Sequence, residues 1–108
     1  MNITAKLKKI RNVLNLVHDN VNHYVSDGRY KEYIVWMEDG EGSSLHLDNN
    51  KNMQTITGTI DFFTKEEYSP VIDSIQKELE KAGISYVLNS VQYEETTQFI
   101  HYEWRFEI

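Results

Sequence analysis

The chain has 108 residues and a mass of 12.8 kDa, the size of one small domain. Hydrophobic residues make up 40% of the chain and charged residues 26%, which excludes a disordered chain. The lack of cysteine excludes disulfides, thiolate metal sites and thiol nucleophiles, and no apolar run approaches the roughly 20 residues that span a bilayer. We therefore expect a soluble intracellular protein with a single α+β domain over residues 1–108.

The net charge of −6 is unevenly distributed. Residues 1–20 hold Lys6, Lys8, Lys9 and Arg11 against Asp19, whereas the rest of the chain holds 7 basic and 16 acidic residues. An acidic surface repels phosphate backbones, so we expect no specific nucleic-acid binding. A basic helix on an acidic body suits contacts between identical copies, although a solvated polar face explains the charge pattern by itself.

An amphipathic helix is predicted over residues 3–20. Its apolar residues recur at steps of four and three and form one stripe, with Asn2 or Thr4 as the N-cap. The stripe consists of Ile3, Leu7, Ile10, Leu14 and Val17. Lys8 and Arg11 fall off this stripe, which makes them the candidate self-assembly residues.

A strand is predicted from Tyr30 to Glu38. Both of its faces are apolar, so we expect it to be central in a sheet or covered on each side. Residues 39–52 are predicted to form a long polar loop, within which residues 45–47 are compatible with a short strand. Loops of this kind often carry contacts, so we name candidate partner-contact residues in it. They are Glu41, Leu45, His46, Asp48 and Asn50.

The next strand is predicted over residues 53–63, where apolar and polar residues alternate. Gly58 on the apolar side indicates the close approach of a helix or a bulge. A second helix is predicted between Thr64 and Gly83, with a loose turn first and the helix proper from Pro70. Gly83 is expected to stop this helix in the left-handed conformation.

A C-terminal hairpin is predicted from residues 85–94 and 98–108. A turn centred on residues 95–97 pairs Val91 with Ile100 and Val87 with Trp104. The element order is then α-β-β-α-β-β. We expect an α+β fold in which a mostly antiparallel sheet of four to five strands packs with two helices.

Candidate catalytic and metal-binding residues are few. The four histidines, at positions 18, 23, 46 and 101, form no metal-binding motif. Asp48, Asn50 and Asn52 match the start of a calcium loop, but Met53 replaces its glycine and Thr59 its final glutamate. No serine lies in a nucleophile elbow and no glycine-rich phosphate loop occurs. We therefore expect no metal, no cofactor and no enzymatic activity.

Three segments resemble small tail proteins of tailed bacteriophages and prophages. They are Tyr33-Ile34-Val35-Trp36-Met37-Glu38, the junction from Gly58 to Lys65, and Asn89 to Glu94 followed by Ile100 to Trp104. The chain is most similar to the tail-terminator or tail-completion family of long-tailed phages, and the resemblance extends over residues 1–108.

This resemblance implies a structural virion protein that assembles as a ring, often a hexamer. Such a ring caps the tail tube and joins the tail to the head connector. The implied partners are further copies of the chain, the tail tube protein and a head-completion or connector protein, and the implied location is the head-proximal end of the virion tail. A neck or head-completion role is the nearest variant. A small acidic immunity or inhibitor protein is the alternative from another class.

Overall fold

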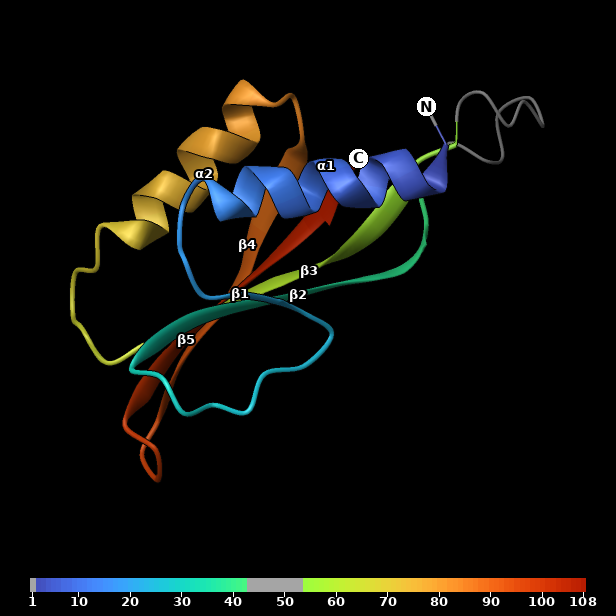
Figure 1. The fold of residues 1–108 in the computed structure, drawn as a ribbon. Coiled ribbons are helices and arrows are strands. Elements are labelled where there is room, and N and C mark those ends of the chain that lie inside the picture. Colours follow the sequence, from blue (N-terminus) through green and yellow to red (C-terminus); the bar gives the residue numbers. More distant parts are fainter. Residues whose placement is uncertain (1, 43–53) are drawn as a thin grey trace.

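The computed structural model describes residues 2–42 and 54–108, which form two helices and five strands (Figure 1). In chain order the elements are α1 (Ile3–Asn15), β1 (Val21–His23), β2 (Glu32–Glu41), β3 (Ile56–Thr64), α2 (Val71–Lys81), β4 (Ser85–Glu94) and β5 (Phe99–Glu107). The strands form one sheet in the order β1-β2-β3-β5-β4. All neighbouring strands are antiparallel except β1 and β2, which are parallel.

The α+β class and the mostly antiparallel sheet are confirmed. The predicted element order lacked β1, which has only three residues and pairs with the first half of β2. A segment this short shows too little alternation to be recognised from sequence. With β1 on its outer side, β2 lies inside the sheet, as its apolar faces predicted.

Both helices lie on the same face of the sheet, above the strands in the view of Figure 1. The core lies between these layers and includes Ile10, Leu14, Ile34, Trp36, Ile60, Phe62, Ile75, Leu79, Trp104 and Phe106. The stripe predicted for α1 thus supplies Ile10 and Leu14, both fully buried. The opposite face of the sheet, which we call the helix-free face, carries the alternate residues of each strand.

The first helix ends at Asn15, earlier than the predicted residue 20. Its start agrees with the prediction, because the Asn2 side chain accepts a hydrogen bond from the Ala5 amide at 2.8 Å. At its end, Leu16 is 75% exposed and the chain turns towards β1. The His18 ring accepts a hydrogen bond from the Asn20 amide at 2.9 Å, which stabilises this turn instead of another helical one.

Strand β3 shows the predicted alternation, with residues 56, 58, 60, 62 and 64 buried. A methyl group on Gly58 would lie 2.2 Å from the Met37 carbonyl oxygen and 2.6 Å from the Phe106 ring. Neighbouring strands, not a helix, therefore make the close approach at Gly58. The register of β2 against β3 also shifts between Glu38 and Gly40, so a bulge lies beside this glycine.

Helix α2 begins at Val71 after the expected loose turn. The hydroxyl of Thr64 accepts a hydrogen bond from the Glu66 amide, and that of Ser69 accepts one from the Val71 amide. These two local bonds close the turn over residues 64–71. Gly83 follows the helix with a φ of 71°, as predicted for a left-handed stop.

The predicted register of the C-terminal hairpin is wrong. Val91 pairs with Tyr102, not Ile100, and Trp104 pairs with Leu88, not Val87. Two features cause the shift: residues 95–98 all belong to the turn, and the register of β4 shifts between Leu88 and Ser90. This bulge reverses the alternation of β4, so a single repeating pattern cannot describe the whole strand.

Candidate functional site

The basic residues predicted to mediate self-assembly lie on the solvent side of α1. Lys8 and Arg11 are exposed, away from the buried stripe, and the Arg11 guanidinium donates to the Asn12 side chain at 3.1 and 3.2 Å. Lys6 differs, since its amino group donates to the carbonyl oxygens of Gln54 and Ile108 and ties the helix to the chain's end. Lys8 and Arg11, but not Lys6, are thus placed to meet another molecule.

Of the candidate partner-contact residues, the described part of the chain includes only Glu41, at the end of β2. Its carboxylate accepts a hydrogen bond from the Gln54 side chain at 2.6 Å. Leu45, His46, Asp48 and Asn50 lie outside the described residues, as do the possible strand at 45–47 and the calcium-loop match.

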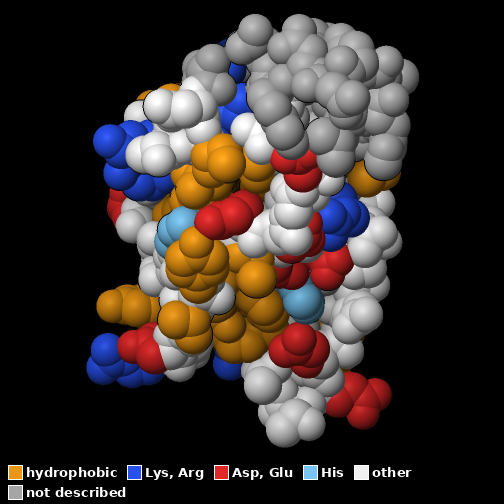
Figure 2. Space-filling model, turned by 90° about the vertical axis from the view of Figure 1, so that its right-hand side faces the viewer, with side chains coloured by type: hydrophobic (Ala, Val, Ile, Leu, Met, Phe, Trp, Pro, Cys, Tyr) orange, Lys and Arg blue, Asp and Glu red, His pale blue; other side chains and the backbone are white. Residues whose placement is uncertain are grey.

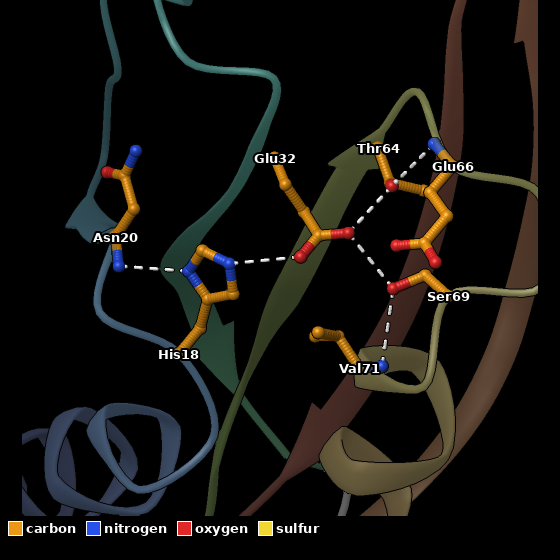
Figure 3. A network of polar contacts seen from close by, with 7 residues as sticks. All are labelled: His18, Asn20, Glu32, Thr64, Glu66, Ser69 and Val71. Atoms are coloured by element: carbon orange, nitrogen blue, oxygen red, sulfur yellow. Dashed lines mark hydrogen bonds and ion pairs between the residues drawn. The ribbon is translucent and has the colours of Figure 1, made fainter.

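A network of polar contacts centred on Glu32 joins four elements (Figure 3). One carboxylate oxygen lies 3.1 Å from Nε2 of His18. The other accepts hydrogen bonds from the hydroxyls of Thr64 at 2.7 Å and Ser69 at 2.9 Å. Thr64 is fully buried and Ser69 only 3% exposed, so Glu32 is the acceptor that satisfies two buried donors.

The hydrogen bonds fix the tautomer of His18. Its Nδ1 accepts the Asn20 amide proton, so the ring's own proton is on Nε2 and is donated to Glu32. The histidine therefore contacts the carboxylate and not a hydroxyl. Ser69 donates to Glu32, which also accepts from Thr64 and His18. The network stabilises the junction of the end of α1, β2, β3 and the start of α2.

A second histidine lies on the helix-free face. Nε2 of His101 is 2.7 Å from the Asp61 carboxylate, and its Nδ1 is 3.6 Å from that of Glu94. The hydrogen bond to Asp61 raises the pKa of His101; burial opposes the change, and the negative charges of Asp61, Glu94 and Glu103 add to it. When it is protonated, the ring offsets part of the acidic charge on this face.

Aromatic rings pack beside His101 on the same face. The Phe63 ring stacks on His101 at 4.2 Å and on Tyr33 at 4.8 Å, and Phe99 meets both Phe63 and Tyr33 edge to face. The amino group of Lys65 lies 4.9 Å from the Phe99 ring centre. These contacts make a second, smaller cluster outside the main core.

Acidic side chains are the most numerous charged groups on the helix-free face. Arg105 binds Asp39 through two hydrogen bonds of 2.9 and 3.1 Å, and these hold the pKa of Asp39 below its usual value. Glu103 accepts a hydrogen bond from a neutral donor, Asn89. Figure 2 shows acidic and histidine side chains beside hydrophobic ones on one side of the molecule. The helix-free face therefore carries acidic, histidine and hydrophobic side chains next to one another.

A third histidine lies at the β1 edge of the sheet. The ring of His23 stacks between Tyr24 and Trp36, with centroid distances of 3.7 and 3.8 Å. Glu38 accepts from His23 at 2.8 Å and from the Tyr24 hydroxyl at 2.5 Å. Burial raises the pKa of Glu38, but these two hydrogen bonds outweigh it and lower the pKa overall. The group covers Trp36 at this edge of the sheet.

The sequence-based prediction missed the exposed apolar residues of β4. This strand is an edge of the sheet, and four of its large apolar side chains are 43–61% exposed, whereas Tyr86 packs against the core. They are Val87, Leu88, Val91 and Tyr93. Their irregular spacing in the sequence could have indicated this exposure. Apolar residues that do not follow a two-residue repeat point to both faces of a strand, so they cannot all face the same core. Exposed apolar residues on a long edge strand mark a surface for contact with another protein.

Among residues 2–42 and 54–108, no three histidine or acidic side chains are arranged to hold a metal ion. Neither of the two described helices is long and apolar enough to cross a membrane.

No protein-family model matches the chain, and no curated protein shows significant similarity to it.

Proposed function

We propose that this chain is a structural, non-catalytic protein that forms a ring with copies of itself and caps a tail tube, as the resemblance to tail-terminator and tail-completion proteins implies. The observation that carries the proposal is the charge division. Helix α1 holds four basic residues and no acidic residue, whereas acidic side chains predominate on the helix-free face of the sheet.

A closed ring needs two different, complementary patches on every subunit. Lys8 and Arg11 supply one patch, because both are exposed and lie on the helix side of the molecule. Asp61, Glu94 and Glu103 on the other side of the sheet supply opposite charge. In such a ring the acidic surfaces also repel DNA that passes through the centre. The segments that carry the phage resemblance also lie in β2, β3, β5 and β4, which are adjacent strands of the sheet.

Measuring the molecular mass of the purified protein over a range of concentrations tests whether it forms a ring. We expect association that weakens when Lys8→Glu and Arg11→Glu are combined, because the basic patch then repels an acidic neighbour. Exposed ion pairs contribute only about 0–1 kcal/mol each, so the effect depends on repetition around the ring and shrinks with added salt. The matched control combines Lys77→Glu and Lys81→Glu on α2, which reverses two exposed charges of another helix.

A chain that stays monomeric at every concentration contradicts the ring and favours the alternative, an acidic immunity or inhibitor protein that binds one partner. The biological role is tested in infected cells that lack the protein. We expect tails of irregular length, or tails not joined to heads. Normal tails on normal heads would contradict the terminator role.

A further inference from the structure

The end of the β4–β5 hairpin carries a groove that none of the predicted sites includes. The groove has a volume of about 600 Å³, with Val91, Tyr93 and Ile100 as its apolar lining and Lys65 and Glu67 at its side. Val91 is 50% exposed and Tyr93 61%. The turn of this hairpin projects from the end of the molecule away from α1 (Figure 1). An apolar groove with an aromatic side chain in it is typical of a contact hot spot.

The charge around this groove is acidic. Lys65 and Glu67 line the groove, and the flanking segments add two exposed glutamates, Glu66 and Glu95. The lysine amino group lies over the Phe99 ring. Tyr68, next to Glu67, is 86% exposed. The groove therefore suits an occupant that has a basic surface and an exposed apolar side chain.

Helix α1 of the same chain has that chemistry. Lys8, Lys9, Asn12 and Leu16 share one side of the helix and line a shallow hollow of their own. Leu16 is 75% exposed, more than most large apolar residues of the described chain. Neither lysine forms an ion pair within the described residues. The two surfaces lie on different parts of the molecule, so they can meet only between two copies.

We propose that the groove at the β4–β5 hairpin receives the Lys8–Leu16 side of α1 from a second copy. The contact joins two different surfaces, which is the kind of contact that closes a ring. The inference rests on the proposed ring function and adds the surface that receives α1. It replaces a contact of charges alone by one in which Leu16 packs on Val91 and Tyr93 while the lysines meet the surrounding glutamates.

The first test compares association of the unaltered chain with that of a groove variant that combines Glu67→Lys and Tyr93→Gln. We expect the dissociation constant to rise about tenfold or more, the size typical of a contact hot spot. The matched control combines Asp73→Lys and Tyr30→Gln, two exposed residues outside the groove. Circular dichroism and urea unfolding show whether each variant remains folded. Unchanged association of a folded groove variant would overturn the groove contact and leave the ring standing.

The second test uses the absence of cysteine, because an introduced cysteine has no competing thiol. A Leu16→Cys copy and a tagged Val91→Cys copy are mixed under mild oxidation. We expect a yield of mixed disulfide dimers well above the yield from a control mixture of Leu16→Cys and Tyr30→Cys copies. Equal yields in the two mixtures would overturn the groove contact. An unaltered chain that never associates would overturn the ring function itself, and the groove contact with it.

Discussion

Removal of the Glu32 carboxylate is expected to destabilise the fold strongly, although the residue is only at the margin of the core. Glu32→Ala leaves the hydroxyls of Thr64 and Ser69 without their acceptor. A buried donor left unsatisfied costs about 1–3 kcal/mol. Because 23% of the Glu32 side chain is exposed, water reaches part of the vacated space. We therefore expect a loss in the lower half of that range for each hydroxyl, which makes about 2–4 kcal/mol for the two together.

The Glu32→Gln variant keeps the shape of the side chain but turns one of its two hydrogen-bond acceptors into a donor. In Glu32→Gln the amide oxygen still accepts from the two hydroxyls, but the amide nitrogen then faces the Nε2 proton of His18. The opposite tautomer of His18 relieves this conflict only by giving up the Asn20 amide. No neutral form of the ring satisfies both neighbours, so we expect Glu32→Gln to cost about 1–2 kcal/mol.

Urea unfolding measures both losses, with Glu66→Gln as the control, since the Glu66 side chain is exposed and lies beside the network (Figure 3). Nitrogen NMR of the unaltered protein is expected to show the proton of His18 on Nε2. A loss below about 0.5 kcal/mol for Glu32→Ala, well under the cost of one unsatisfied donor, would refute the view that Glu32 supports the two buried hydroxyls.

Two further predictions concern Gly58 and His101. Gly58→Ala is expected to lower the free energy of unfolding by about 1–3 kcal/mol, because the added methyl group meets the Met37 carbonyl oxygen. The control is Gly40→Ala, where the nearest atom lies 3.8 Å from the added methyl group, so urea unfolding should show almost no loss. Equal losses for the two variants would contradict this reasoning. The raised pKa of His101 stabilises the fold fully below the ring's unfolded pKa of 6.5, and this contribution is lost as the pH rises through the folded value. His101→Gln should therefore flatten the dependence of unfolding free energy on pH above pH 6.5, and a slope that stays unchanged would disprove the role of this ion pair.

The sequence predicted the parts of the fold that depend on local pattern. The α1 stripe, the β3 alternation and the left-handed Gly83 all follow from residues within a few positions of each other. The end of α1 was predicted too late, because the apolar stripe continues to Val17, which packs against the core although the helix ends at Asn15. Strand β1 was missed because it has only three residues, too few to show a recognisable alternation.

The Glu32 network shows why the polar sites were harder to predict than the core. The hydroxyls of Thr64 and Ser69 both accept local amide protons, as the predicted loose turn before α2 requires. Their more important bonds run to Glu32, more than 30 residues away in the sequence. Nothing in the local pattern around Glu32 distinguishes it from a solvated acidic residue. The groove at the hairpin was missed for a similar reason, since it depends on the bulge in β4 and on the position of residues 65–68.

The Glu32 network and the groove are physically linked. Thr64 and Ser69 bracket residues 65–68, in which Lys65 and Glu67 form one wall of the groove. Because both hydroxyls are held by the same carboxylate, Glu32 fixes the two ends of that wall. We therefore expect Glu32→Gln to weaken both stability and association, whereas Glu67→Lys combined with Tyr93→Gln should weaken association alone. Association of the folded variants is measured over a series of protein concentrations without urea. If Glu32→Gln associates as tightly as the unaltered chain, the wall does not depend on the network, and the two features have separate roles.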